Sequence, residues 1–230
     1  MPASKDHLDD YFQWEVRSWS RALPMWHKAL MALRHDKMPQ ALALGERDGG
    51  LSLMLAEHGC SVVCSDLRGP TERARELHAA HDRAGSVTYE SIDTLSIPKP
   101  DNSFDAVVFK SMIGALSTKE RQAQAIREMH RVLKPGGMLL FAENLHGTAL
   151  HGWLRKRFVA WDAYWRYLDV NTDRDLFKPF LRLDDATTGF LANLGRSEGQ
   201  RDLIARFDGL IMPIVPKSMR TIWFGVAIKG

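Results

Sequence analysis

Cysteine is scarce in this chain, which contains only Cys60 and Cys64 among its 230 residues. In an extended segment the Cα atoms of these two residues would lie roughly 13 Å apart, too far for a disulfide. Two such cysteines also lack the spacing of a zinc site, and no metal-binding set is predicted. We therefore expect two buried thiols in a reducing compartment.

Long apolar runs and targeting signals are also missing. No apolar stretch approaches the roughly 18 residues that a membrane span needs. The N-terminus, MPASKDHLDDYF, has no basic region followed by an apolar one, which argues against a secretory signal. From both absences we expect a cytoplasmic protein.

Neither sign of charge dominates the composition. The chain has 31 basic and 28 acidic residues, a net charge of +3 that is too small to indicate nucleic-acid binding without a local basic patch. Hydrophobic residues make up 45% of the chain and charged residues 26%, which is typical of a globular protein. A chain of 230 residues suits one α/β domain, alone or with a helical appendage.

A strand, a glycine-rich turn and a helix are predicted between Gln40 and Gly59. The short apolar run Ala41–Leu44 favours a buried strand that ends at Gly45. Apolar residues from Leu51 onward then predict a helix, with Gly59 suited to a left-handed cap at its end. Glycines in such a turn allow a ligand to approach backbone atoms that a Cβ would shield.

A second strand, Ser61–Cys64, is followed by Asp66. An acid about 20 residues after a glycine turn can bind two ribose hydroxyls. The run Gly45-Glu46-Arg47-Asp48-Gly49-Gly50 fits neither the dinucleotide fingerprint G-x-G-x-x-G nor a Walker loop. The pattern therefore indicates an adenosine-type ligand without specifying phosphates. A turn with incidental glycines is the alternative.

Strands and helices continue to alternate up to about residue 145. The predicted elements are a helix over Gly69–Ala84, strands over Val87–Tyr89 and Phe104–Phe109, a helix over Thr118–Leu133 and a strand over Met138–Ala142 that follows the stop signal Lys134-Pro-Gly-Gly137. This alternation predicts a parallel sheet with right-handed crossovers and a ligand at the carboxyl ends of the strands.

The two ends of the chain differ from this pattern. Residues 5–35 are predicted to be helical and divided by Pro24, either packed on the domain or lying across the site as a lid. Toward the other end, Trp153–Leu168 shows helical spacing of apolar residues with a basic run, and residues 173–212 are expected to be mostly helical. Thr221–Ile228 is a clear terminal strand.

The order of these segments resembles the class I S-adenosylmethionine-dependent methyltransferases, in particular their small-molecule branch. The resemblance covers about residues 39–145 and rests on LALGERDGG, CSD, SID before Ile97-Pro98, FDAVVFKSMIGAL and EMHRVLKPGGMLLFAEN. It implies an α/β fold, a three-layer sandwich with a seven-stranded, mostly parallel, Rossmann-like sheet whose last strand is antiparallel. An N-terminal helical segment (1–38) and a helical cap insertion (about 146–212) would be added to the methyltransferase domain (39–230).

The resemblance also implies roles in binding S-adenosylmethionine. Asp66 would bind the ribose, Leu67 and the backbone of Ile92 would contact the adenine, and Asp93 would accept a hydrogen bond from the adenine amino group. The glycine turn would be formed by Gly45, Arg47 and Gly49. Lys110 and Ser111 would lie near the sulfonium. The family turn is Gly-x-Gly-x-Gly, so Arg47 replaces the middle glycine and could contact the ligand's carboxylate. The alternatives are a helix cap for Asp66, an Asx turn for Asp93 and a solvated charge for Lys110.

Methyl transfer is an in-line displacement in which the cofactor supplies the electrophile. An oxygen acceptor also needs a base to remove its proton. His146 is our first candidate, because a loop histidine beside the site has a suitable pKa, and His151 and Glu143 follow. Both histidines could instead be ordinary surface residues.

The function predicted from the sequence is O-methylation of a small-molecule acceptor, a sugar or another secondary metabolite. One alternative is methylation of a lipid or lipid-linked glycan at a membrane surface, suggested by the basic aromatic segment 153–168. Another is a regulatory protein that binds S-adenosylmethionine without catalysis, suggested by Arg47. No nucleic-acid partner is expected, while peripheral membrane contact and a homodimer stay open.

Overall fold

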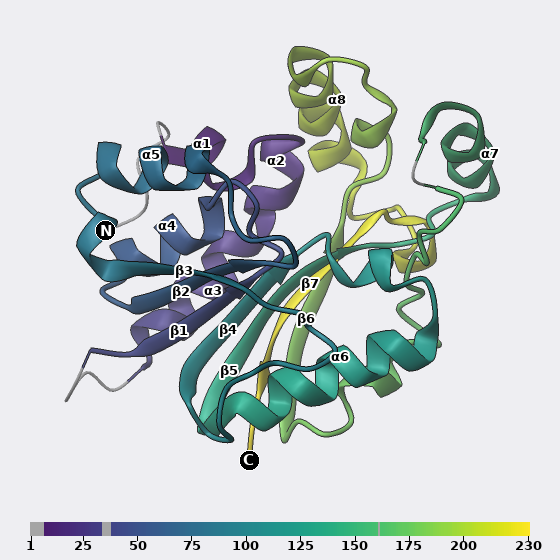
Figure 1. Cartoon of the computed structure of the whole chain (residues 1–230). Coiled ribbons are helices and arrows are strands. Elements are labelled where there is room, and N and C mark those ends of the chain that lie inside the picture. The colour runs from purple at the N-terminus through teal and green to yellow at the C-terminus, as the bar shows by residue number, and fades with distance from the viewer. Residues whose placement is uncertain (1–6, 34–37, 161) are drawn as a thin grey trace.

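The computed structural model describes residues 7–33, 38–160 and 162–230, and its centre is a seven-stranded sheet in the order β3-β2-β1-β4-β5-β7-β6 (Figure 1). The strands are β1 (Gln40–Leu44), β2 (Ser61–Asp66), β3 (Val87–Ser91), β4 (Phe104–Lys110), β5 (Leu133–Asn144), β6 (Arg182–Thr188) and β7 (Ile222–Ile228). Strands β1 to β5 pair in parallel, and β7 runs antiparallel to both β5 and β6. The predicted fold class, including the antiparallel last strand, is confirmed.

Helices cover both faces of the sheet. They are α1 (Leu8–Phe12), α2 (Val16–Trp19), α3 (Leu23–Met31), α4 (Gly50–Glu57), α5 (Glu72–Ala80), α6 (Lys119–Val132), α7 (Ala149–Phe158) and α8 (Glu198–Ile211), with 3-10 turns η2 (Ser20–Ala22), η3 (Ala84–Ser86), η4 (Ile113–Leu116), η5 (Arg174–Phe177), η6 (Ala192–Leu194) and η7 (Lys217–Met219). Within the described part of the chain, no helix is both long and apolar enough to cross a bilayer.

Alternate residues of each central strand enter two separate hydrophobic clusters. Ala41 and Ala43 of β1 face the first cluster, with α1, α3 and α4, whereas Leu42 and Leu44 face the second, with α6 and η5. This alternation is the side-chain pattern of a strand that is buried on both faces. The three-layer arrangement follows from it.

The predicted strand–turn–helix unit at Gln40–Gly59 is confirmed in detail. Gly45 and Gly49 have φ of 68° and 80°, and Gly59 (φ 80°) ends α4 in the left-handed region as expected. Cys60 and Cys64 are free thiols and both are buried, also as predicted.

One boundary agrees with the sequence-based expectation and one differs. Pro24 divides the N-terminal segment as predicted, because it occupies the first turn of α3, where its missing N–H costs nothing. The stop signal after α6 does not separate helix from strand, because β5 begins directly at Leu133, which pairs with Phe104 of β4. The register between β4 and β5 shifts next to Phe104, so the glycines of the stop signal have no regular partner in β4. Regular pairing resumes at Met138.

The segment after β5 is less helical than predicted. The helix expected over Trp153–Leu168 is α7, which ends at Phe158, and Leu168 instead bridges Leu145. The region 173–212, expected to be mostly helical, contains the edge strand β6 followed by η6 and α8. Because β6 is an edge strand with the polar sequence RLDDATT, it lacks the apolar run that marks the inner strands.

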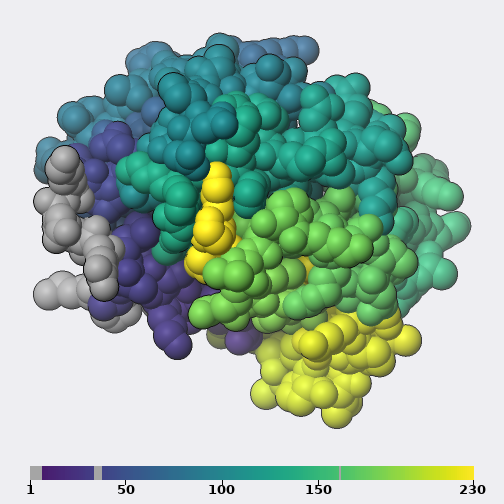
Figure 2. Space-filling view, turned by 90° about the horizontal axis from the view of Figure 1, so that it is seen from below, coloured from purple at the N-terminus to yellow at the C-terminus, as the bar shows by residue number. Residues whose placement is uncertain are grey.

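Viewed from the amino edge of the sheet, the last residues of the chain lie between the N-terminal segment and the segment near residue 185 (Figure 2). A hollow of about 1550 Å³ opens at this edge, lined by α3, the Lys134–Gly137 turn and the adjoining ends of β6 and β7. It lies at the opposite edge from the glycine turn, and parallel α/β sheets bind their ligands at the carboxyl edge. We therefore separate this hollow from the candidate site.

Gly50, the first residue of α4, is packed against the backbone of α1. A Cβ at Gly50 would lie 2.3 Å from the carbonyl oxygen of Tyr11 and 2.5 Å from that of Asp10. We expect Gly50→Ala to lower the free energy of unfolding by about 1–3 kcal/mol, because backbone must move to admit the methyl group. Urea denaturation measures this change.

The matched control is Gly152→Ala in α7, where a Cβ would meet nothing within 4 Å. This substitution should leave stability unchanged or raise it by up to about 1 kcal/mol, because alanine favours helix over glycine. Equal effects of the two substitutions would contradict the close packing of α1 on α4.

Candidate active site

Two acidic residues lie side by side at the carboxyl ends of β2 and β3. Asp66 pairs in register with Ser91, and the amide of Ile92 donates to the Asp66 carbonyl at 3.1 Å. The carboxylate of Asp66 accepts from the amide of Arg68, and that of Asp93 accepts from the amide of Leu95 at 2.9 Å. The second of these is the Asx turn considered as an alternative.

The ribose and adenine candidates therefore form one surface. Leu67 is 65% exposed next to Asp66, Asp93 is also exposed, and Ile92 is buried between them. An apolar side chain flanked by two accessible carboxylates suits a ligand with a flat ring and several hydroxyl or amino donors. The parallel register brings these residues together, as the sequence predicted.

The glycine turn after β1 holds a buried carboxylate. Glu46 is 7% exposed, and its carboxylate accepts from the amides of Leu51 and Ser52 at 2.7 and 3.2 Å, at the start of α4. A negative charge is favourable at a helix N-terminus. Burial nevertheless raises the pKa of Glu46.

Arg47, by contrast, points to solvent. Its side chain is 74% exposed, with Nε 3.8 Å from Asp48, while its backbone carbonyl accepts from the amide of Thr71. The arginine in place of the middle glycine is therefore accommodated at the surface of the turn. On the other side of the turn, a Cβ at Gly45 would lie 2.5 Å from the side chain of Met112, so the loop after β4 packs directly on this glycine.

Lys110, the last residue of β4, lies among carboxylates and indole rings. Its Nζ is 4.5 Å from the ring centroid of Trp14 and 5.2 Å from that of Trp19. Burial lowers the pKa of Lys110, and the charges of Glu46, Glu15 and Glu143 oppose that shift. Lys110 is thus not the solvated rim charge considered as an alternative.

Glu143, near the end of β5, fixes the loop that follows β4. It is fully buried, and its Oε2 accepts from the amides of Met112 and Ile113 at 2.8 and 2.9 Å. Its Oε1 accepts from the amide of Asn144 at 2.8 Å. Because both oxygens are engaged by backbone, the geometry favours a positioning role for Glu143 over the role of catalytic base.

Ser111, directly after Lys110, has a strained backbone with φ of 48°. Its hydroxyl accepts from Nδ2 of Asn144 at 2.7 Å, and its amide donates to the carbonyl of Ala142 at 2.8 Å. Residues other than glycine keep such a left-handed backbone conformation only where several contacts hold them in it, and this is often at functional sites. Ser111 is therefore fixed at the centre of the carboxyl edge.

His151 and His146 are in different environments. His151 is buried; its Nδ1 accepts from the amide of Thr148 at 3.0 Å and its Nε2 lies 2.6 Å from the carbonyl of Phe190. Both nitrogens are used in capping α7 and binding the next loop, and burial lowers the pKa of the ring. His146 is exposed, with its ring centroid 5.9 Å from that of Tyr167, so it is the better placed of the two for proton transfer.

The N-terminal segment lies across the carboxyl edge, together with α8 (Figure 1). The amides of Glu15 and Val16 both donate to the carboxylate of Glu198 at 2.9 Å, and Nε of Arg17 lies 2.6 Å from Asp202. Trp19, Trp26 and Leu30 of the same segment are buried in the first hydrophobic cluster, so the expectation that the segment packs on the domain is confirmed, while the role of a lid stays a prediction.

Three residues of this site were not identified from the sequence, namely Glu46, Glu15 and Trp14. Glu46 could have been found, because an acid directly after a buried strand and its first glycine must lie at the ligand edge. Trp14 and Glu15 carried no local signal, because their positions depend on long-range contacts with Lys110 and α8.

Glu15 gives the site a dependence on pH. Burial raises its pKa from 4.5 to about 7, so the folded state holds a proton that the unfolded state has released. The stability conferred by that proton is complete below pH 4.5 and is lost as the pH rises through 7. The native chain should therefore lose stability between pH 4.5 and pH 8, whereas Glu15→Gln has no proton to release at this position. The unfolding free energy of the variant relative to that of the native chain should rise by about 2–3 kcal/mol over this range. Urea denaturation at both pH values tests this.

The exposed substitution Glu76→Gln is the control and should leave the pH dependence unchanged. Parallel stability profiles for the native chain and Glu15→Gln would contradict the burial of a protonated Glu15.

Comparison with known proteins identifies the region from β1 to β5. A family model described as "Methyltransferase domain" matches residues 42–141. A demethylmenaquinone methyltransferase of Thermus thermophilus is 34% identical over 121 residues, which cover 51% of this chain and 53% of that protein. The ubiquinone/menaquinone biosynthesis C-methyltransferase UbiE of Escherichia fergusonii is 32% identical over 99 residues, which cover 43% and 38%. The chain thus spans about half the length of these curated relatives, or less.

Solved structures resemble the whole chain in fold. A phosphoethanolamine N-methyltransferase 2 of Haemonchus contortus, in complex with S-adenosylhomocysteine, has a TM-score of 0.64 at 19% identity, covering 92% of this chain and 52% of that one. A putative sarcosine dimethylglycine methyltransferase of Galdieria sulphuraria has a TM-score of 0.61 at 17% identity, covering 92% and 86%. Residues 42–141 thus match a methyltransferase domain, and the chain shares the fold and the sheet order of these solved methyltransferases.

Proposed function

We propose that the protein binds S-adenosylmethionine at the carboxyl edge of its sheet and transfers the methyl group to a small-molecule acceptor. The observation that carries this proposal is the adjacency of Asp66 and Asp93 at the ends of β2 and β3, beside the glycine turn of β1. Read from β3 through β2 to β1, these strand ends follow the order of adenine, ribose and methionine in the ligand. When bound, the cofactor supplies the electrophilic methyl group.

Each part of the site then has a distinct task. Asp66 binds the ribose hydroxyls, Leu67 and Ile92 enclose the adenine, and Asp93 accepts from its amino group. Gly45 and Gly49 adopt the positive φ that shapes the turn beside the ligand. Lys110 and Ser111 lie where the sulfonium would sit.

The surroundings of Lys110 suit a cation as well as an anion. Indole faces attract cations, and Trp14 and Trp19 already lie near the Lys110 ammonium. The carboxyl groups of Glu15 and Glu46 add oxygen acceptors near the same place, and each favours a sulfonium when it is ionised. The ammonium of Lys110 and the guanidinium of Arg47 are the candidate partners for the methionine carboxylate.

Asp66→Ala should weaken S-adenosylmethionine binding by about 100-fold to 10,000-fold, because two hydrogen bonds to a charged acceptor are lost at about 1.5–3 kcal/mol each. Isothermal titration calorimetry measures the affinity. Glu76→Ala, an exposed acid on α5, is the control and should bind like the native chain. Equal affinity of the native chain and Asp66→Ala would remove the assignment of the ribose site.

Turnover separates an enzyme from a binding protein. Release of S-adenosylhomocysteine with candidate acceptors supports transfer, whereas binding without release supports the regulatory alternative. His146 is the proposed base, because both nitrogens of His151 and both oxygens of Glu143 are engaged within the protein. A base is required whether the acceptor is a hydroxyl oxygen or an acidic ring carbon.

The acceptor atom is the finer part of the proposal. O-methylation of a sugar or other secondary metabolite is the expectation from the sequence, whereas the names of the quinone C-methyltransferases favour a carbon on a lipophilic ring. We favour a lipophilic acceptor because of the exposed apolar side chains on α7 and α8. Exposed apolar residues on α7 and α8 form what we call the α7–α8 surface, made of Leu150, Trp153, Phe158, Leu203, Phe207 and Leu210.

Helices α7 and α8 lie beyond the carboxyl edge of the sheet (Figure 1), and both apolar and basic residues are exposed on and near them. Trp153 is 62% and Phe158 60% exposed, and the guanidinium of Arg196 lies 5.4 Å from the ring centroid of Phe158. Lys156 and Arg157 are exposed as well. Arg155 does not belong to this basic run, because it lies over the ring of Tyr167 at 4.0 Å and donates to the His146 carbonyl. The combination suits transient contact with an anionic membrane that holds a lipophilic acceptor.

The double variant Trp153→Ser/Phe158→Ser should reduce flotation with anionic phospholipid vesicles at least several-fold, because interfacial binding scales with buried apolar area. The control is Met31→Ser, which removes a 75% exposed apolar side chain from α3 at the far edge. If the native chain does not float, or if both variants lose flotation equally, the α7–α8 surface is not a membrane contact.

A further inference from the structure

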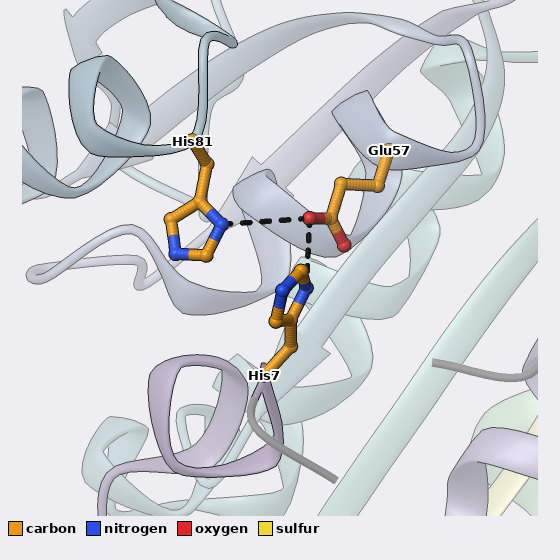
Figure 3. Close-up of side chains that lie close together, drawn as sticks. All are labelled: His7, Glu57 and His81. Carbon is orange, nitrogen blue, oxygen red and sulfur yellow. Dashed lines mark ion pairs between the residues drawn. The ribbon is translucent and has the colours of Figure 1, made fainter. Parts of the chain in front are cut away.

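Two histidines and a glutamate from three different helices converge away from the glycine turn (Figure 3). His7 is the N-cap of α1, Glu57 the last residue of α4, and His81 the C-cap of α5. Nδ1 of His7 lies 3.0 Å and Nδ1 of His81 3.7 Å from the same Glu57 oxygen, Oε1. All three ligand atoms lie within 4.8 Å of one another.

These separations match one shared metal ion. Zinc binds histidine nitrogens and carboxylate oxygens at about 2.0–2.2 Å, so ligand atoms around a tetrahedral ion lie roughly 3.3–3.5 Å apart. The two measured separations, 3.0 and 3.7 Å, fall on either side of that value. We propose that His7, Glu57 and His81 bind a zinc-class divalent ion.

A neighbouring carboxylate determines which nitrogen of His81 is free. Nε2 of His81 lies 3.0 Å from Oδ2 of Asp10, so in the neutral ring the proton sits on Nε2 and is donated to Asp10. Nδ1 then presents a lone pair toward the oxygen of Glu57, an arrangement that a cation between them stabilises. A carboxylate that orients a histidine in this way is the usual outer partner of a metal ligand.

Glu57 has an outer partner as well. The hydroxyl of Tyr11 donates to Oε2 of Glu57, which leaves Oε1 as the oxygen directed at both histidines. The three ligand side chains are between 16% and 33% exposed, so an ion could reach them from solvent. Two nitrogen ligands and one oxygen ligand leave a fourth position for water, a set that suits zinc better than calcium or magnesium.

The ion would join α1 to α4 and α5. Helix α1 already lies with its backbone against Gly50, at the start of α4, and leads to Trp14 and Glu15 at the carboxyl edge. Metal binding would therefore hold the N-terminal segment in place over the candidate active site. The site does not depend on the proposed methyl transfer, and it is tested by metal binding alone.

The experiment is a competition titration of Zn²⁺ between a chromogenic chelator and the tag-free, chelator-treated full chain. We expect one Zn²⁺ per chain, and Co²⁺ should give the strong visible bands of a four-coordinate ion. His81→Gln and His7→Gln should each weaken binding at least about 100-fold, and Asp10→Asn about 10-fold to 100-fold through loss of orientation.

His58→Gln is the matched control, because His58 follows Glu57 directly but lies outside the cluster and contacts the Met54 carbonyl. Circular dichroism and denaturant midpoints without metal show whether each variant folds. With added Zn²⁺, the midpoint of the native chain should rise and that of His81→Gln should not. Absence of stoichiometric Zn²⁺ binding, or equal binding by the native chain, His7→Gln and His81→Gln, would overturn the proposal and leave only imidazole–carboxylate hydrogen bonds.

Discussion

The buried ammonium of Lys110 is the charge on which the carboxyl edge depends. Charges of Glu46 in the glycine turn, Glu15 in the N-terminal segment and Glu143 in β5 all act on it. Desolvation disfavours each of these charges, since it raises the pKa of Glu15 and Glu46 and lowers that of Lys110, and the attraction between opposite charges opposes these shifts. Lys110 thereby couples three segments that are distant in sequence, and the N-terminal segment becomes part of the site.

The carboxylate of Glu143 accepts hydrogen bonds from backbone amides, and its role therefore differs from that of a carboxylate that faces the site. Glu143 holds Met112 and Ile113, and Met112 in turn packs on Gly45. The end of β5 thus determines the shape of the glycine turn two strands away. Such an outer layer keeps a binding site in its productive geometry.

The sequence predicted the inner part of the fold well, together with the residues that meet at its carboxyl edge, for a physical reason. Strands β1 to β5 are apolar runs with glycines or acids at their ends, so local pattern and parallel topology together place Asp66 and Asp93 on one edge. The outer elements could not be predicted in this way. Strand β6 is a polar edge strand, and α7 stops at Phe158 because the chain beyond it packs along Leu145. The environments of Glu15 and His151 depend on tertiary contacts that no local pattern encodes.

The central claim is that S-adenosylmethionine binds at the carboxyl edge, and a crystal structure of the native chain with S-adenosylhomocysteine tests it most directly. We predict density for the ligand between Asp66 and Lys110, with the adenine against Leu67 and Ile92. Ligand density in the amino-edge hollow lined by α3 and the Lys134–Gly137 turn, or none at saturating ligand, would contradict the account.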